Sequence, residues 1–350
     1  MSSTPSSFSG GYLATAWGIV GVFTATYVAF HLATHSAASL ETATSQLLRG
    51  ETHWITFQNR LLGCALIELI RLLTGSTWLQ AFYILVGSCS FVAGAILVHR
   101  AWQWHGDVAS ALGAVAAWFL LAVFFNHVWS YPWDFVGALL NLLLLIWVSD
   151  HYRSPGDLWS WRPLVLLFAQ ILNRESSLIT LVSLALMVGM HDLRKSSRGA
   201  ALRAVSALAA GAVGNIALVI ALRRLLFVAS TRPASSAHVN ETVAGNFLQL
   251  RDNFSIFVAE RLPIRMAVAS IIAGFGLLCV ASLVRCWQDW RMTGTVEPGP
   301  TFALCYLGVS TAALAFFACA SEFRVYYELI PVCIVLALSL RPPVVSGMPA

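Results

Sequence analysis

Residues 78–98 read WLQAFYILVGSCSFVAGAILV, a stretch that contains no Asp, Glu, Lys, Arg or His. An α-helix rises 1.5 Å per residue, so about 20 consecutive apolar residues cross the hydrocarbon core of a bilayer. A run of this length inside a soluble protein would leave one face of the helix without an apolar partner. The stretch therefore predicts a transmembrane helix.

Similar apolar runs recur along the whole chain. Of the 350 residues, 58% are hydrophobic and 11% are charged, whereas about a quarter of the residues in a soluble domain are charged. Strong candidate spans are Tyr12–Ala33, Trp78–Val98, Val108–His127, Trp133–Val148, Ala204–Val228, Ile264–Val284 and Phe302–Ala320; weaker ones are Leu164–Leu172, Leu178–Met190 and Leu329–Leu340. We expect an all-α fold, a polytopic transmembrane helical bundle, in which residues 1–350 form a single integral membrane domain.

The basic residues between these runs predict which loops face the cytoplasm. They cluster at His99–Arg100, at Arg153, in residues 194–198, at Arg285 and Arg291, and at Arg341. The positive-inside rule places these loops, and the tail 341–350, in the cytoplasm. The longer loops 34–58 and 230–261 then lie outside. Because residues 1–11 lack the basic n-region of a secretory signal, we expect Tyr12–Ala33 to remain as an anchor.

Two segments do not fit simple crossings. Leu164–Leu172 and Leu178–Met190 are short, and are expected to form a hairpin whose turn, Asn173-Arg174-Glu175, dips into the membrane from outside. Asn59–Leu73 places Arg60, Glu68 and Arg71 at helical spacing among Leu and Ile, which is typical of an interfacial or re-entrant amphipathic helix. The sequence thus predicts about ten crossings, with both termini cytoplasmic.

Four groups of polar residues fall at the outer ends of the expected helices. They are Gln58-Asn59-Arg60, Tyr131-Pro132-Trp133-Asp134, Asn173-Arg174-Glu175, and Glu322-Phe323-Arg324 followed by Tyr326, Tyr327 and Glu328. A charge at membrane depth costs a few kcal/mol and usually faces a cavity, a partner or a substrate. We therefore expect an outward-facing polar cavity that these groups share.

Each group also has a purely structural explanation. Asp134 follows Pro132 and opens a helix, so it suits a capping carboxylate stabilised by the helix dipole. Arg174 and Glu175 are able to neutralise each other, Glu322 and Arg324 to lie in an aqueous loop, and Arg60 to snorkel to the interface. These alternatives stay open at the level of the sequence.

Arginines beside carboxylates suit one kind of chemistry particularly well. Arginine binds phosphate in bidentate fashion, and a carboxylate removes the proton from an attacking hydroxyl. In this hypothesis Asp134 is the general base, and Glu175 orients the acceptor or takes the base role. Arg60, Arg174 and Arg324 would neutralise a lipid phosphate, and the remaining substrate contacts are Asn59, Tyr131, Glu322 and Glu328. The aromatic residues that could stack on sugar faces, and that are equally expected at a membrane interface without any sugar, are Trp54, Tyr131, Trp133, Tyr326 and Tyr327.

At these same residues the chain resembles bacterial multi-spanning proteins related to the C-type glycosyltransferases. The resemblance rests on Gln58-Asn59-Arg60, on Tyr131-Pro132-Trp133-Asp134, on Asn173-Arg174-Glu175, and on Glu322-Phe323-Arg324 with Glu328. It implies an all-helical protein of the bacterial inner membrane that takes a polyprenyl-phosphate-linked sugar on the extracytoplasmic side. It also implies a glycan or lipid acceptor and a role in the cell envelope.

The chain departs from this family in the first outer loop. The resemblance implies a catalytic carboxylate there, often in an acidic-x-acidic pattern, but the loop contains only the widely separated Glu41 and Glu51. Either the base has moved to Asp134 or Glu175, or the likeness of fold does not extend to the activity.

The same polar groups also suit two other functions. A transporter or flippase for a lipid-linked or anionic substrate also uses broken helices with charged turns, and a glycan ligase or polymerase is a second enzymatic alternative. The net charge of +5, spread over short loops, does not indicate nucleic-acid binding. His31, His35, His53 and His127 match no metal-ligand spacing, so a divalent metal is possible but unsupported by the sequence, and no cofactor is certain.

Overall fold

The computed structural model describes residue 27 and residues 37–49, 60–125, 131–174, 176–192, 198–226, 260–317 and 323–340. Within these ranges every regular element is helical, as expected for an all-α fold. The elements are α2 (Ala37–Leu48), α3 (Leu61–Thr74), α4 (Trp78–His105), α5 (Val108–Phe125), α6 (Pro132–His151), η2 (Pro155–Trp159), α7 (Trp161–Asn173), α8 (Ser177–Asp192), α9 (Arg198–Leu226), α12 (Leu262–Thr293), α13 (Pro298–Phe317), η3 (Phe323–Leu329) and α14 (Ile330–Ser339).

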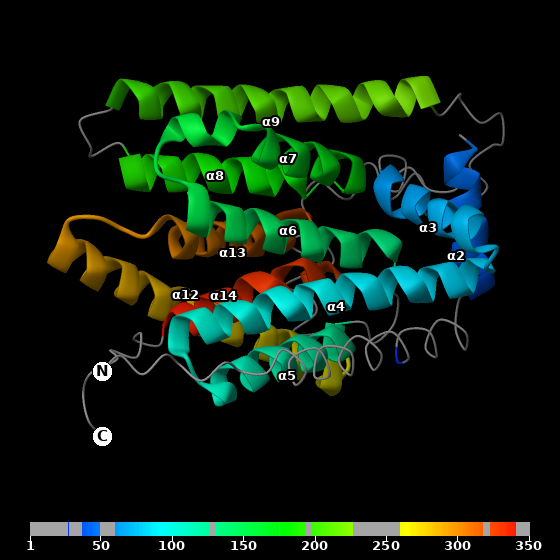
Figure 1. Cartoon of the computed structure of the whole chain (residues 1–350), viewed down its shortest axis with the longest axis horizontal. Helices are drawn as coiled ribbons and strands as arrows, with labels where there is room; N and C mark the ends of the chain where they lie inside the picture. The colour runs from blue at the N-terminus through cyan, green and yellow to red at the C-terminus, as the bar shows by residue number, and fades with distance from the viewer. Residues whose placement is uncertain are drawn as a thin grey trace, which may run out of the picture.

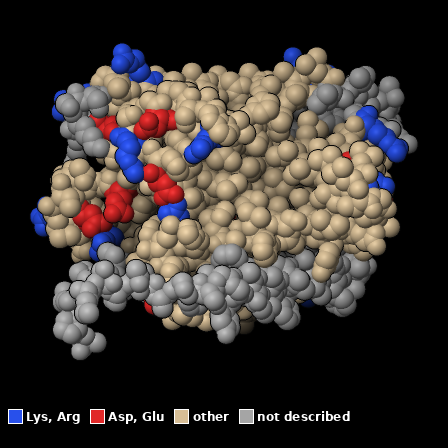
Figure 2. Space-filling model, viewed as in Figure 1, with Lys and Arg blue, Asp and Glu red and all other residues tan. Residues whose placement is uncertain are grey.

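The long helices run along one direction and form a bundle (Figure 1). Among the described helices, α4, α5, α6, α9 and α12 are long and apolar enough to cross a membrane. Figure 2 shows most charged side chains near one end of the visible face and fewer at the other, with a broad band free of them between. The molecule is therefore built as a membrane protein. The expected ten crossings are a finer statement that these helices do not establish.

Helix α6 forms the centre of the bundle. In the apolar stretch of α6, 72% of the residues are buried inside the protein. The corresponding share is 11% for α9 and 17% for α12. Helix α6 packs against α3, α4, α7, α13, η3 and α14. Helices α9 and α12 instead expose large apolar side chains such as Val213 and Leu277, which is stable only where lipid is the solvent. Polar groups on α6 consequently lie in the interior.

Local signals explain where the helices begin and end. Helix α4 starts at a capping box, in which the Thr77 side chain and the Gln80 backbone are paired, and ends at Gly106, whose φ of +66° suits glycine. Helix α6 starts at Pro132. Proline has no backbone N–H, and it is favoured in the first turn because the N–H groups there have no acceptor within the helix. Helix α4 therefore begins at Trp78, as expected, and continues past the expected end at Val98 to His105, where Gly106 ends it.

The two irregular segments also form helices. Helices α7 and α8 are the limbs of the predicted hairpin and are joined through residues 174–176. Helix α3 covers the expected amphipathic segment. It buries Gly63, Cys64 and Ile67 and exposes Leu72 and Leu73 at its far end. It lies at one end of the bundle, beside the start of α6 (Figure 1).

The opposite end of the bundle is tied together by polar contacts. Arg100 at the end of α4 pairs with Asp150 at the end of α6. The hydroxyl of Tyr152, directly after α6, donates to Asp192 at the end of α8. The His105 ring lies 3.0 Å from the carbonyl oxygen of Leu338 on α14. These contacts fix the end of α6 against α4 and α8.

Several expected features lie outside the described residues. They include all of the Tyr12–Ala33 anchor except residue 27, nearly all of loop 230–261, and the tail 341–350. In the expected outer loop 34–58, the described part forms α2.

Candidate functional site

The first turn of α6 positions a buried carboxylate. Pro132 opens the helix, and Asp134 lies two residues later. The backbone N–H of Tyr131 donates to Asp134 Oδ2 at 3.1 Å, and Asp134 is fully buried, with 0% of its surface exposed. The capping role that the sequence suggested is therefore present. It uses only one of the two carboxylate oxygens.

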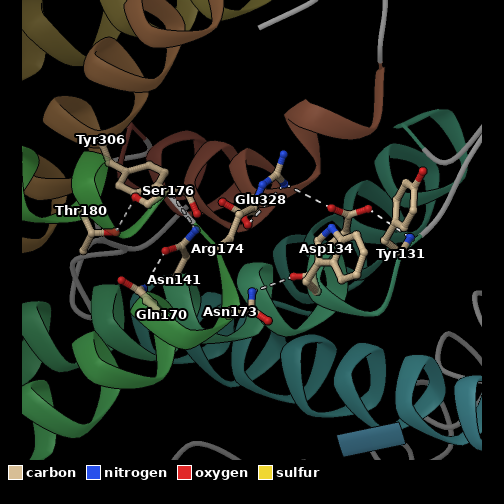
Figure 3. Close-up of polar contacts among 11 residues, drawn as sticks. Tyr131, Asp134, Asn141, Gln170, Asn173, Arg174, Ser176, Thr180, Tyr306 and Glu328 are labelled. Carbon is tan, nitrogen blue, oxygen red and sulfur yellow. Dashed lines mark hydrogen bonds and ion pairs between the residues drawn. The ribbon is translucent and has the colours of Figure 1, made fainter. Parts of the chain in front are cut away.

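Arg174 joins Asp134 to a second buried carboxylate (Figure 3). Its Nη1 lies 3.1 Å from Asp134 Oδ1 and 3.5 Å from Glu328 Oε1. The Arg174 side chain is 13% exposed and that of Glu328 6%. These three residues, called the ion cluster below, come from the start of α6, the α7–α8 junction and η3. A single guanidinium shared by two carboxylates satisfies both with one cation.

Glycine at position 137 allows Glu328 to reach this place. A Cβ atom added to Gly137 would overlap Glu328 Oε1 and would lie 3.1 Å from Asn173 Nδ2. The Ser176 hydroxyl donates a further hydrogen bond to the Glu328 carboxylate. The backbone of α6 and the polar start of α8 thus form the pocket wall against which the Glu328 side chain packs.

Arg60, directly before α3, stacks on the same turn of α6. Its guanidinium carbon lies 5.3 Å from the centre of the Trp133 ring, and the Tyr131 and Trp133 rings stack at 4.7 Å with an interplanar angle of 14°. Arg60 is only 9% exposed, so its side chain packs against the protein. Because Tyr131 and Arg60 take up the Trp133 ring, this ring is not free to stack on a sugar.

A set of uncharged polar side chains continues from the ion cluster into the bundle. Asn173 Nδ2 donates to the Trp133 carbonyl oxygen at 2.8 Å. Deeper inside, Gln170 Nε2 donates to Asn141 Oδ1, and Asn141 Nδ2 donates to the Tyr306 hydroxyl, both at 2.8 Å. The Tyr306 hydroxyl also bonds to Thr180 (Figure 3). These hydrogen bonds satisfy polar groups at a depth where water is scarce.

Sequence reasoning missed this inner set and Gly137. Asn141 lies seven residues after Asp134, two helical turns along one face of α6, and Gln170 lies one turn before Asn173. This spacing was the available signal that the polar face continues inward.

The structure brings together Arg60, Tyr131, Asp134, Arg174 and Glu328 from the candidate residues. Asn59, Glu175 and Glu322 lie outside the described residues, and Arg324 is described only as part of the η3 backbone. Arg174 contacts Asp134 and Glu328; the suggested pair of Arg174 with Glu175 lies outside the described residues. Whether these residues bind substrate or catalyse a reaction stays a prediction, and so does the outward-facing cavity.

The described residues offer no second cluster beside this site for a metal ion. Among the described residues, no group of three or more His, Cys, Asp or Glu side chains could hold a metal ion. His31, His35, His53 and His127 lie outside those residues. A small pocket at the opposite end is lined by Ser282, Arg285, Cys286, Asp289, Glu297, Pro300 and Ser339. It has no contact with the ion cluster.

Comparison with known proteins gave no match to a family model, to a curated protein or to a solved structure. The case for a function therefore rests on the chain's own residues.

Proposed function

We propose that the chain is an integral membrane glycosyltransferase that takes a sugar from a polyprenyl-phosphate donor on the extracytoplasmic face. The observation that carries this proposal is the ion cluster: Asp134, Arg174 and Glu328 in contact, buried, at one end of a membrane-embedded bundle. This reaction requires a base for the acceptor hydroxyl and a cation that binds the donor phosphate. The setting we propose is the bacterial inner membrane, with a glycan or lipid of the cell envelope as acceptor.

The proposal includes a topology and an open state. We place about ten crossings in the membrane, with both termini in the cytoplasm and the start of α6 outside. Since Asp134 is fully buried, substrate must reach it by separation of the segments that close over it. Segment η3, which supplies Glu328, is the part whose movement would expose both carboxylates.

Arg174 is the residue whose contacts would change most on binding. Its charge is already shared by two carboxylates, so a donor phosphate would compete with them for the guanidinium. The contact with Glu328, at 3.5 Å, is longer than that with Asp134 at 3.1 Å, and we expect it to yield first. Arg60, held over Trp133, would supply the second cation.

Asp134 is suited to act as the base. Its Oδ2 accepts from the Tyr131 N–H and its Oδ1 from Arg174, and these two contacts hold the carboxylate in one orientation. In the proposed step, the acceptor hydroxyl gives its proton to Asp134, and its oxygen forms a bond to the anomeric carbon. The bond from that carbon to the phosphate oxygen breaks, and its electron pair leaves with the polyprenyl phosphate. Arg174 and Arg60 would stabilise the negative charge that develops there.

One observation favours transport as a second candidate. Asn141, Gln170, Tyr306 and Thr180 extend the polar region from the ion cluster into the bundle. Transporters place substrate sites at such depth, beside interrupted helices such as the α7–α8 junction. A transporter would move its substrate without breaking a bond.

The test is transfer by the purified chain in vesicles of polar lipid. The vesicles would hold undecaprenyl phosphate linked to radiolabelled glucose, galactose, mannose or N-acetylglucosamine, with a membrane extract as the source of acceptor. We expect label to leave the donor lipid and enter the acceptor fraction. Asp134→Asn keeps an oxygen for the Tyr131 N–H but cannot take a proton at neutral pH, so we expect transfer to fall at least about a hundredfold.

Asp157→Asn is the matched control, because Asp157 caps η2 through backbone N–H groups at the opposite end of the bundle. It should leave transfer unchanged. Movement of intact labelled donor across the vesicle membrane, without bond cleavage, would replace the transferase with the transporter. Full transfer by the Asp134→Asn variant would remove Asp134 from the mechanism.

A further inference from the structure

Two amide side chains on α7 leave part of their hydrogen-bonding capacity unused. Asn173 and Gln170 each donate through nitrogen to α6, to the Trp133 carbonyl oxygen and to Asn141 Oδ1. Among the described residues, Asn173 Oδ1 and Gln170 Oε1 have no hydrogen-bond partner, although the two residues are only 1% and 4% exposed. Buried acceptors of this kind are rare in folded proteins and indicate a missing partner.

Rotation of the amide groups cannot remove this deficit. The partner of Asn173 is a backbone carbonyl oxygen, which only accepts, so the amide nitrogen must face it and the amide oxygen must face elsewhere. For Gln170, reversing the chain of donors through Asn141 and Tyr306 would leave the Gln170 nitrogen without a partner instead. A further hydrogen-bonding group is required in either arrangement.

Asn173 lies beside the ion cluster, and Gln170 lies one helical turn deeper on α7. Asn173 directly precedes Arg174, and its Nδ2 lies 3.1 Å from the place of a Cβ on Gly137, which Glu328 also approaches. Gln170 and Asn173 are three residues apart on one helix, a spacing that places their Cβ atoms about 5–6 Å from each other. Two hydroxyl groups on a sugar ring can span this distance.

We propose that Asn173 and Gln170 form a hydroxyl-recognition subsite next to the phosphate-binding arginines. This inference rests on the proposed function and adds the part of the donor that these residues contact, its sugar ring. An ionised phosphodiester has no hydrogen to donate, whereas every sugar hydroxyl has one, so acceptor oxygens at this place select for the sugar. A buried water is the other source of such a hydroxyl group, and the experiment separates the two.

The experiment compares two ligands on one protein. Dissociation constants would be measured by native mass spectrometry of the full chain, for undecaprenyl phosphate alone and for the same lipid linked to the four sugars named above. We expect at least one sugar-bearing lipid to bind about tenfold more tightly than the bare lipid phosphate. In Asn173→Leu and in Gln170→Leu, the ratio of the two constants should fall to about one.

Asn215→Leu provides a matched control. Asn215 is likewise 4% exposed and donates through Nδ2 to the Ser177 hydroxyl at 2.7 Å. Its Oδ1 has no partner in the described part of the chain, but the residue lies on α9. Its removal should leave the ratio as in the unaltered protein. The ratio is taken within one protein, so loss of stability alone does not change it, and Gln170→Leu tests the subsite if Asn173→Leu does not fold.

Three results would overturn the subsite. If bare lipid binds and no sugar tightens it, the two oxygens hold water. If the sugar tightens binding and Asn173→Leu and Gln170→Leu keep the full ratio, the sugar is recognised elsewhere. If neither the bare nor the sugar-bearing lipid binds, the proposed function fails, and the subsite fails with it. The bare lipid contains no sugar, so its binding tests the proposed function separately from the subsite.

Discussion

Gly137 of α6 lies directly against the carboxylate of Glu328, so closely that a single added methyl group would overlap Glu328 Oε1. Glu328 is only 4% exposed and also contacts Arg174 and Ser176. The absence of a side chain at position 137 therefore determines whether η3 can place its carboxylate in the bundle.

Gly137→Ala should lower the stability of the protein in detergent. The added Cβ must displace Glu328 or the α6 backbone, which costs about 1–3 kcal/mol, and Arg174 loses one of its two partners. Thermal denaturation followed by circular dichroism measures this effect. Gly94→Ala, on α4 with nothing within 4 Å of the added Cβ, should be neutral or slightly stabilising. Equal stability of the two variants would show that Glu328 is not confined by Gly137.

Arg174→Leu should destabilise the protein more than Glu328→Gln. Without Arg174, Asp134 and Glu328 remain buried with no shared cation, which costs about 3–5 kcal/mol. Without the Glu328 charge, Arg174 keeps Asp134 as its partner, and the loss is about 2 kcal/mol. Chemical denaturation of both variants and of the double variant gives the coupling between the two residues.

Arg71→Leu is the control for that series, because Arg71 pairs with Glu68 at 2.9 Å with both side chains about one-third exposed. Its removal should cost less than about 1 kcal/mol. If the effects of Arg174→Leu and Glu328→Gln simply add in the double variant, the two groups do not interact and the ion cluster is not a unit.

Tyr152→Phe should change how stability depends on alkaline pH. Burial, and then the hydrogen bond to Asp192, raise the pKa of the Tyr152 phenol well above its usual value of 10.0. The unfolded chain therefore ionises this phenol at a lower pH than the folded chain does. Its contribution to stability is complete below pH 10 and decreases as the pH rises further.

At pH 8 the Tyr152→Phe variant should be about 1–2 kcal/mol less stable, since Asp192 loses a donor. Between pH 10 and 11 the difference from the unaltered protein should become smaller. Denaturation of both proteins across this range measures the difference. A gap that stays constant from pH 8 to pH 11 would show that the phenol is not held in its protonated form by the fold.

The sequence predicted the apolar helices well because apolar runs of sufficient length have few alternatives to a bilayer. Helices α4, α6 and α12 contain the expected spans Trp78–Val98, Trp133–Val148 and Ile264–Val284, and α5 and α9 cover the described parts of Val108–His127 and Ala204–Val228. The hairpin of α7 and α8 and the separate helix α3 were predicted from short length and from charges at helical spacing. The number of crossings was less accessible, since α7 and α14 are too short for length alone to decide their role.

The site was predictable as a gathering of groups at one end, but its contacts were not. Glu328 was expected to contact substrate, yet it pairs with Arg174 over Gly137. Nothing in the sequence links position 137 to position 328, because that contact depends on how η3 enters the bundle. Asn141 and Gln170 look like ordinary single amides until the register of α6 against α7 pairs them.

Orientation in the membrane decides whether the ion cluster can meet an extracytoplasmic donor. Arginines occur at both ends of the described bundle, including Arg100 and Arg153 at one and Arg60 and Arg261 at the other.

The most direct measurement is labelling of single cysteines in intact cells with a membrane-impermeant thiol reagent, on a cysteine-free background. Thr74→Cys and Arg261→Cys mark the end with the ion cluster, and Ser160→Cys and Thr295→Cys mark the opposite end; all four positions are exposed. We predict labelling of the first two and protection of the last two until the cells are opened. The reverse pattern would place Asp134, Arg174 and Glu328 on the cytoplasmic side and contradict transfer from an extracytoplasmic lipid-linked sugar.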